Sequence, residues 1–149
     1  MWGPGLVAKE AAGTRNRQSA FAAIDLTPTL LTIAQVDVPQ NANFDGEPLA
    51  DTLLGRSTQS RRAPLFFSRP PDRKSFYGLN NLPDLAMRHG DWKLLCDCDG
   101  SRPELYDLAR DQGEKRNLES EQPQVVENMT KQVTDWFAQM PDEVVKALQ

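Results

Sequence analysis

Cationic and aromatic side chains gather in the longest irregular stretch of the sequence, residues 69–84. This stretch contains three prolines and one glycine and shows no helical or strand periodicity, so we predict a long loop. Long loops within compact domains are often functional. Cationic groups bind anions, and aromatic faces suit sugar rings. The alternative is a solvated surface loop whose arginine side chains contact no ligand. The candidate binding residues are Arg69, Arg73, Lys74, Phe76 and Tyr77.

Residue types that usually carry catalysis are scarce in this chain. His89 is the only histidine, and it stands just before Gly90, where a tight turn between two strands is expected. Cys96 and Cys98 could supply at most two thiolates, too few for a tetrahedral metal site. No serine has a second candidate base nearby for a nucleophilic triad. The sequence therefore indicates no catalytic residue and no metal ligand.

Composition limits the class of protein. A chain of 149 residues forms one domain or two small ones, and a net charge of −4 argues against a general nucleic-acid binder. The mean hydropathy is −0.57 and no apolar run approaches about 18 residues, so we expect no membrane span. The first residues lack the pattern of a signal peptide. Between positions 56 and 96, eight basic residues stand against three acidic ones, which favours either an anion site or a solvated surface.

Four short apolar runs predict the sheet that must hold the loop. They lie at residues 65–67, 85–88, 92–96 and 104–108, with turn signals between them, which is typical of an antiparallel meander. Such a sheet needs cover on one face. Residues 121–140 are predicted to form the covering helix, because their apolar side chains fall within roughly 120° of one helical face. These side chains are Val125, Val126, Met129, Val133, Trp136, Phe137 and Met140.

The first third of the chain has a different character. A short helix is predicted at residues 27–34, with Thr27 as its cap and Pro28 in its first turn. A turn at residues 44–47 precedes leucines at helical spacing that end at Gly55, and the basic, polar residues 56–63 suit a linker. We therefore expect the chain to divide into residues 1–55 and 56–149.

Four motifs in this order resemble those of the sulfatase family. They are DLTPTLL at residues 25–31, FDGEPL at 44–49, LAMRHGDWKL at 85–94, and ELYDL at 104–108 followed by Asp111, Gly113-Glu114 and Asn117-Leu118. Pro48 stands where the family usually has a small or polar residue, and Gln112 stands where proline is common. No single motif is diagnostic, but their order and spacing across nearly the whole chain are specific. The chain most resembles the arylsulfatase branch that includes N-acetylgalactosamine-6-sulfatases.

The resemblance implies a fold. Intact family members have an alkaline-phosphatase-like α/β fold with a large N-terminal domain, which would lie outside this chain. Residues 1–55 would be the C-terminal tail of that large domain. Residues 56–149 would be the small α+β C-terminal domain, a four-stranded antiparallel sheet with one packed helix.

The resemblance also implies an activity, the hydrolysis of sulfate esters of aryl or glycan substrates. Family enzymes use a formylglycine made from the cysteine of C-x-P-S-R, a Ca²⁺ ion held by Asp and Asn, and cationic groups that cradle the sulfate. None of these groups maps onto this chain, so the chain alone is expected to be inactive. The loop would contact the sugar beyond the sulfate. Intact family members are often periplasmic, secreted or lysosomal, and the compartment of this chain stays open.

One segment resembles the C-x-P-S-R motif that supplies the nucleophile in the family. CDGSR at residues 98–102 differs from C-x-P-S-R by a glycine in place of the proline. It stands at an expected hairpin, whereas a nucleophile of this kind should lie at a helix N-terminus, whose amides stabilise an anion. We therefore interpret Cys98 as a turn residue.

Two other functions are compatible with the sequence. The chain could be a stand-alone, non-catalytic module that binds sulfated glycans through the basic loop. It could also be a relic or a truncated gene product without activity.

Overall fold

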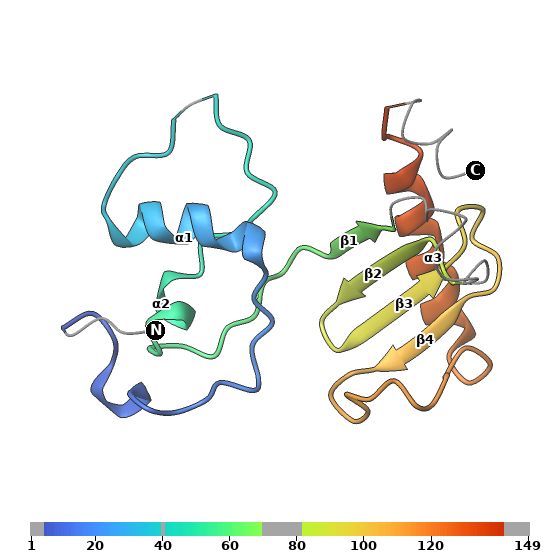
Figure 1. Cartoon of the computed structure of the whole chain (residues 1–149), viewed down its shortest axis with the longest axis horizontal. Coiled ribbons are helices and arrows are strands. Elements are labelled where there is room, and N and C mark those ends of the chain that lie inside the picture. The colour runs from blue at the N-terminus through green and yellow to red at the C-terminus, as the bar shows by residue number, and fades with distance from the viewer. Residues whose placement is uncertain (1–4, 40, 70–81, 142–149) are drawn as a thin grey trace, which may run out of the picture. The chain divides into compact units, whose positions relative to one another are not determined.

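The computed structural model describes residues 5–39, 41–69 and 82–141, and its contacts divide the chain into two compact units after Ala63 (Figure 1). The boundary expected from the sequence lies after Gly55 instead. Residues 56–63 stay with the first unit because hydrogen bonds and the burial of Arg61 hold them there. The Thr52 hydroxyl donates to the carbonyl of Gln59 at 2.8 Å, the Arg61 residue is buried, and the backbone N–H of Ala63 donates to the Glu47 carboxylate at 2.6 Å.

The first unit is built around two short helices. α1 spans Leu26–Ile33 and α2 spans Ala50–Leu53, and single 3₁₀ turns lie at Lys9–Ala11 and Ala23–Asp25. The chain leaves α2 through Gly55 at φ 75°, a backbone conformation that glycine adopts without strain. The prediction that Thr27 caps α1 is wrong: Thr27 lies inside the helix, and Asp25 occupies the preceding position.

The second unit contains the predicted antiparallel meander. Its strands are β1 (Leu65–Ser68), β2 (Leu85–His89), β3 (Trp92–Cys96) and β4 (Glu104–Asp107), and they lie side by side in chain order. Met87 pairs with Phe66 on one side and with Leu94 on the other, and Leu94 pairs with Leu105. Because paired residues share a face, this register puts one row of apolar side chains across the whole sheet.

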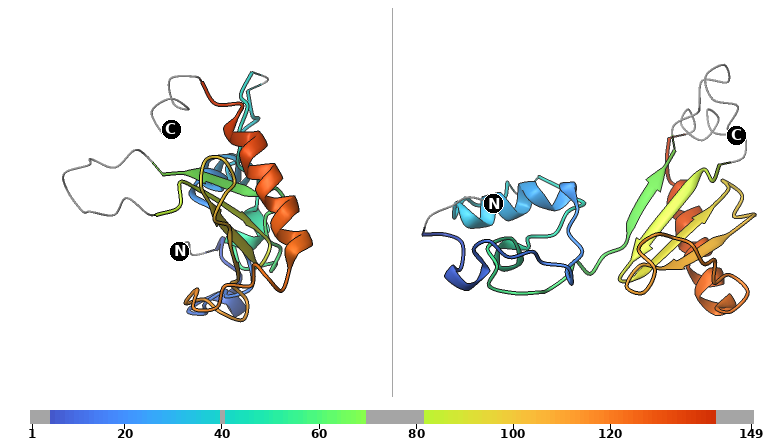
Figure 2. Two further views of the ribbon diagram at one scale, coloured as in Figure 1. Left: turned by 90° about the vertical axis from the view of Figure 1, so that its right-hand side faces the viewer. Right: turned by 60° about the horizontal axis from the view of Figure 1, so that its bottom comes forward.

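α3 (Pro123–Phe137) covers that apolar face, as Figure 2 shows. Met129, Val133 and Phe137 are buried among the side chains of β2, β3 and β4, which confirms the predicted packing of the helix on the sheet. The Trp136 ring stacks on the Phe66 ring with centroids 5.2 Å apart. Within the described ranges, no helix is long and apolar enough to cross a membrane.

Candidate functional site

The foot of the predicted binding loop is formed by Arg69 and Asp84. The backbone N–H of Arg69 donates to the Asp84 carbonyl at 2.7 Å, which brings the end of β1 and the approach to β2 together. The Arg69 guanidinium donates to the Leu82 carbonyl at 3.2 Å and lies 3.4 Å from the Asp84 carboxylate. Arg69 therefore anchors the two ends of the loop. The other four candidates, Arg73, Lys74, Phe76 and Tyr77, lie outside the described residues.

The CDGSR segment is a tight turn between β3 and β4. The Gly100 N–H donates to the Asp97 carbonyl at 2.9 Å, and the Arg102 guanidinium forms two bonds of 2.6 and 2.7 Å to the Asp97 carboxylate. Gly100 has φ 82°, and a β-carbon there would lie 2.8 Å from the Thr130 methyl group on α3. The glycine that distinguishes this segment from C-x-P-S-R is therefore required by the turn and by its contact with the helix.

Both cysteines are free thiols whose pKa is raised. Burial, with the neighbouring Asp97 charge, raises the pKa of Cys96 to about 12. Burial, followed by the charge of Asp84, raises the pKa of Cys98 to about 11. Reactive cysteines have the opposite property, a lowered pKa in an electropositive environment. These positions therefore do not suit nucleophilic chemistry.

The described residues also offer no place for a metal ion. His89 is exposed at the turn between β2 and β3. No group of three or more His, Cys, Asp or Glu side chains in the described ranges is arranged to hold a metal. The formylglycine and the Ca²⁺ ion that the sulfatase resemblance implies therefore do not fit the residues that the structure describes.

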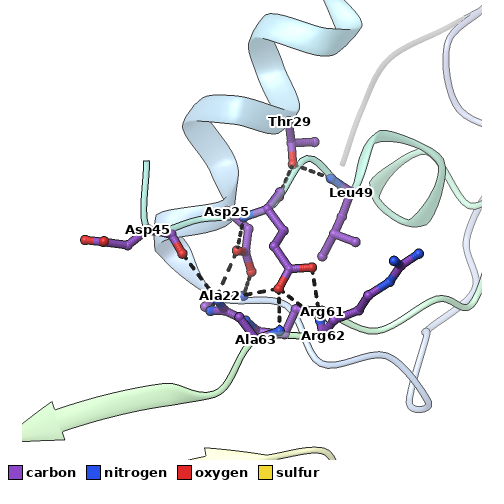
Figure 3. A network of polar contacts seen from close by, with 9 residues as sticks. Ala22, Asp25, Thr29, Asp45, Leu49, Arg61, Arg62 and Ala63 are labelled. Carbon is purple, nitrogen blue, oxygen red and sulfur yellow. Dashed lines mark hydrogen bonds and ion pairs between the residues drawn. The ribbon is translucent and has the colours of Figure 1, made fainter. Parts of the chain in front are cut away.

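A buried polar network lies in the first unit (Figure 3). The Asp25 carboxylate is 0% exposed and accepts hydrogen bonds from the backbone N–H of Ala22 at 2.8 Å and of Glu47 at 2.9 Å. The Arg61 guanidinium lies 3.7 Å from Asp25 and donates to the Asp45 carbonyl at 3.4 Å. Asp25 thus joins the start of α1 to the segment before α2 and to residue 61.

Glu47 and Thr29 complete this network. The Glu47 carboxylate accepts the backbone N–H groups of Arg62 at 3.0 Å and Ala63 at 2.6 Å. Partial burial alone would raise the pKa of Glu47, but the hydrogen bonds from Ala63 and Arg62 outweigh it and hold the pKa below its ordinary value. The Thr29 hydroxyl accepts the backbone N–H of Leu49 at 2.9 Å. This hydrogen bond ties α1 to the residue that precedes α2.

Gly46 lets the two segments of the network approach each other. A β-carbon at this position would lie 2.0 Å from the carbonyl oxygen of Ile24 and 2.9 Å from the α-carbon of Asp25. The motifs DLTPTLL and FDGEPL therefore meet at a buried structural clamp. Asp25 is inaccessible to a substrate, so the clamp positions backbone and performs no chemistry of its own.

Arg61 is the member of this clamp that sequence reasoning missed, because residues 56–63 read as a solvated linker. Nothing in the spacing pairs Arg61 with Asp25. The available signal for such a partner was Asp25, the carboxylate of the DLTPTLL motif, because a buried carboxylate requires hydrogen-bond donors or a counterion.

Known sulfatases are similar to this chain over most of its length. Arylsulfatase K of Mus musculus is 32% identical over 128 residues, which cover 84% of this chain and 22% of that protein. An N-acetylgalactosamine-6-O-sulfatase of Bacteroides thetaiotaomicron is 28% identical over 128 residues, 76% of this chain and 23% of that protein. A solved sulfatase from glycosaminoglycan metabolism in B. thetaiotaomicron matches with a TM-score of 0.57 at 25% identity, covering 81% of this chain and 25% of that chain. No family model matches.

The similarity extends over both units, and the chain spans about a fifth to a quarter of the length of these proteins. The fold of the solved sulfatase confirms the predicted alkaline-phosphatase-like class, and the four-stranded sheet with its packed helix has the architecture expected of a C-terminal sulfatase part. The chain belongs to the sulfatase family.

Proposed function

We propose that this chain is the C-terminal part of a sulfuric ester hydrolase that acts on sulfated glycans. The observation that carries the proposal is the 32% identity to arylsulfatase K across 84% of the chain. The relatives named as N-acetylgalactosamine-6-O-sulfatase and Delta 4,5-hexuronate-2-O-sulfatase support a sulfated sugar as the substrate class. A stand-alone glycan-binding module is less favoured, because it would require only the loop, whereas the similarity also includes the clamp of the first unit.

The catalytic step is assigned to the remainder of the intact enzyme. The first unit, residues 1–63, is assigned to the tail of its large α/β domain, and the second unit to its small C-terminal domain. In the family, formylglycine supplies a nucleophile and Ca²⁺ stabilises negative charge. Because neither group fits the described residues, this chain should not turn over an aryl sulfate with Ca²⁺ added. Turnover that disappears in Cys98→Ala would contradict this. An in-frame C-x-P-S-R codon run upstream of Met1 would support the proposal, and its absence from the genomic DNA would favour a relic.

For the loop, the proposed role is to bind the sugar beyond the sulfate through Arg69, Arg73, Lys74, Phe76 and Tyr77. Two features support it. The loop combines three cations with two aromatic rings, and its foot at Arg69 and Asp84 is rigidly tied to the sheet. Contacts remote from the reacting group strengthen only the binding of larger substrates.

The test uses the intact enzyme with Arg73 and Lys74 both changed to Ala. We expect an unchanged kcat/KM for a small aryl sulfate and a several-fold lower kcat/KM for a sulfated oligosaccharide. Lys131→Ala, which removes one positive charge on the exposed side of α3, is the control and should change neither value. Equal effects on both substrates would refute the role of the loop.

A further inference from the structure

A cleft of about 370 Å³ lies where the turn between β2 and β3 meets the first two turns of α3. His89 pairs with Trp92 across the turn, so their side chains share the face of the sheet that α3 covers. The helix contributes two pairs of residues at i, i+4 spacing, which places each pair side by side. We call this surface the turn cleft; its lining residues are His89, Trp92, Gln124, Val125, Asn128 and Met129.

The turn cleft combines an apolar floor with a hydrogen-bonding rim. Trp92 and Val125 are half-buried and Met129 is buried, so these three form the floor. The other three lining residues, a histidine, a glutamine and an asparagine, are exposed and form the rim. Small-molecule sites have this composition, in which apolar walls supply contact area and a few polar groups fix the orientation of the ligand.

The polar groups of the rim have hydrogen-bonding capacity that the protein does not use. Within the described residues, the side chains of His89 and Gln124 form no hydrogen bond. The Asn128 carboxamide oxygen accepts the Gln132 side chain at 2.5 Å, which holds the Asn128 side chain in place and leaves its NH₂ group for a ligand. Carboxamide and imidazole groups can both donate and accept hydrogen bonds, as the hydroxyl groups of a sugar do.

The charges beside the turn cleft favour an uncharged ligand. Arg88 and Lys93 adjoin lining residues in the sequence, but they line a depression on the opposite face, because neighbouring side chains of a strand point to opposite faces. Asp91 and Glu127 also adjoin lining residues, and both are exposed acids. A sulfate group would therefore meet negative charge here, whereas an uncharged ring would not.

We propose that the turn cleft binds one uncharged sugar ring of a glycan chain, with the ring on the Trp92 indole and its hydroxyl groups on the carboxamides of Gln124 and Asn128. This inference rests on the proposed function, because it takes glycans as the substrate class. An indole offers a large apolar face to the C–H groups of a sugar ring. The volume of the cleft lies at the small end of ligand sites and suits a single ring.

The turn cleft is separate from the contacts proposed for the loop. Asp84, at the foot of the loop, and His89 lie at opposite ends of β2, roughly 17 Å apart along an extended strand. A sugar held at the turn cleft is therefore not the sugar that the loop would contact. Such a remote contact strengthens binding only for glycans long enough to reach it.

The test titrates the full 149-residue chain with two uncharged probes, an N-acetyllactosamine hexasaccharide and methyl N-acetylgalactosaminide. Nuclear magnetic resonance follows the indole N–H signals, and Trp92→Phe identifies the signal of Trp92. We expect this signal to shift saturably with at least one probe. The signal of Trp136, whose ring stacks on Phe66, should stay unchanged. No shift of the Trp92 signal with either probe at millimolar concentration would overturn the proposal.

A double variant, Gln124→Ala with Asn128→Ala, tests the rim. Both residues are exposed, so the indole signals without probe should match those of the natural chain, and the affinity for the probe should fall roughly tenfold. Gln139→Ala removes an exposed carboxamide beyond the end of α3 and should leave the affinity unchanged. Equal affinity in the double variant and the natural chain would overturn the proposal.

Two other occupants of the turn cleft are outcomes of the same titration. If only the 6-O-sulfated form of the hexasaccharide shifts the Trp92 signal, the ligand is an anion and the proposal is wrong. If the signal shifts when the protein concentration alone is raised, and no probe moves it further, a second copy of the chain occupies the cleft, which would also overturn the proposal.

Hydrolysis separates this inference from the function on which it rests. If the chain binds an uncharged probe at Trp92 while the intact enzyme hydrolyses no sulfated glycan, the proposed function is contradicted and the turn cleft stands. If the intact enzyme hydrolyses a sulfated glycan with the same kcat/KM in its natural form and in the double variant, and no probe shifts the Trp92 signal, the turn cleft alone is overturned.

Discussion

At the scale of single residues, the motifs DLTPTLL and FDGEPL are explained by burial rather than by catalysis. Asp25 is fully buried, and its oxygens are used by two backbone N–H groups and by the Arg61 guanidinium. Removing one member of such a network leaves the others unpaired in a low-dielectric site, which is costly. The residues of the clamp are therefore sensitive positions even though none of them contacts a substrate.

Gly46→Ala tests the close approach within the clamp. The added β-carbon would meet backbone atoms of Ile24 and Asp25, which cannot move away without disrupting the clamp. We expect a loss of roughly 2–4 kcal/mol in the free energy of unfolding, measured by urea titration. Gly113→Ala is the control, because its nearest neighbour is the flexible end of the Lys115 side chain. It should cost about 0.5 kcal/mol or less, and equal losses in both variants would contradict the steric argument.

Glu47 should make the first unit sensitive to acid. Its pKa is lower in the folded protein than the ordinary value of 4.5, so it stabilises the fold fully above that pH. This contribution is lost as the pH falls through the lowered folded-state pKa. We expect Glu47→Gln to be less stable than the natural protein at pH 7, and the difference to shrink at pH 3, by urea titration at both values. The exposed Glu127→Gln on α3 is the control. A pH-independent difference for Glu47→Gln would show that its charge is not the cause.

At the scale of elements, the second unit is held together by the contact between α3 and the sheet. The helix buries Met129, Val133 and Phe137 on one side and exposes Lys131 and Asp135 on the other. The stacked rings of Trp136 and Phe66 extend this contact to β1. Because the sheet has only four strands, the helix supplies most of the cover for its apolar face.

Phe137→Ala tests this packing. Phe137 is 3% exposed, so truncation should leave a cavity and lower the free energy of unfolding by roughly 3–5 kcal/mol. Lys131→Ala, which removes an exposed ion pair with Asp135, should cost about 0.5 kcal/mol or less. Chemical denaturation followed by the far-ultraviolet circular dichroism of the helix measures both. Similar small losses would mean that α3 contributes little to the unit.

At the scale of the whole molecule, the chain consists of two units that differ in how fully their apolar side chains are buried. Among its described residues, the second unit has a continuous core of eight buried side chains between sheet and helix. In the first unit, Ile24, Leu26 and Leu30 are each at least 40% exposed on and beside α1. Exposed apolar side chains of this kind favour association, and they agree with the proposal that this unit is the tail of a larger domain.

Two truncations test this division. Residues 64–149 should unfold cooperatively and be more soluble than the full chain, because the core of the second unit is retained and the apolar surface of α1 is removed. Residues 56–149 keep Arg61 without Asp25 and should gain no stability over residues 64–149. Thermal unfolding and light scattering give both results. A failure of residues 64–149 to fold, while the full chain folds as a sharp monomeric unit, would contradict the division after Ala63.

Local signals in the sequence determined the order of elements in this protein. Gly90-Asp91 and Asp99-Gly100 predict the hairpins, and the helical periodicity around Val133 predicts α3 and its buried side. These features depend on residues that are near each other in the chain, because turn residues and amphipathic spacing act over a few positions. The order of the four motifs indicated the family in the same way.

The tertiary structure alone decided which residues far apart in the sequence meet. The Asp25 carboxylate takes its counterion from Arg61, 36 positions later, and this contact helps to keep residues 56–63 with the first unit, which ends at Ala63. Burial, and with it the cost of an unpaired charge, is a property of the packed molecule, so no local pattern could have revealed these contacts.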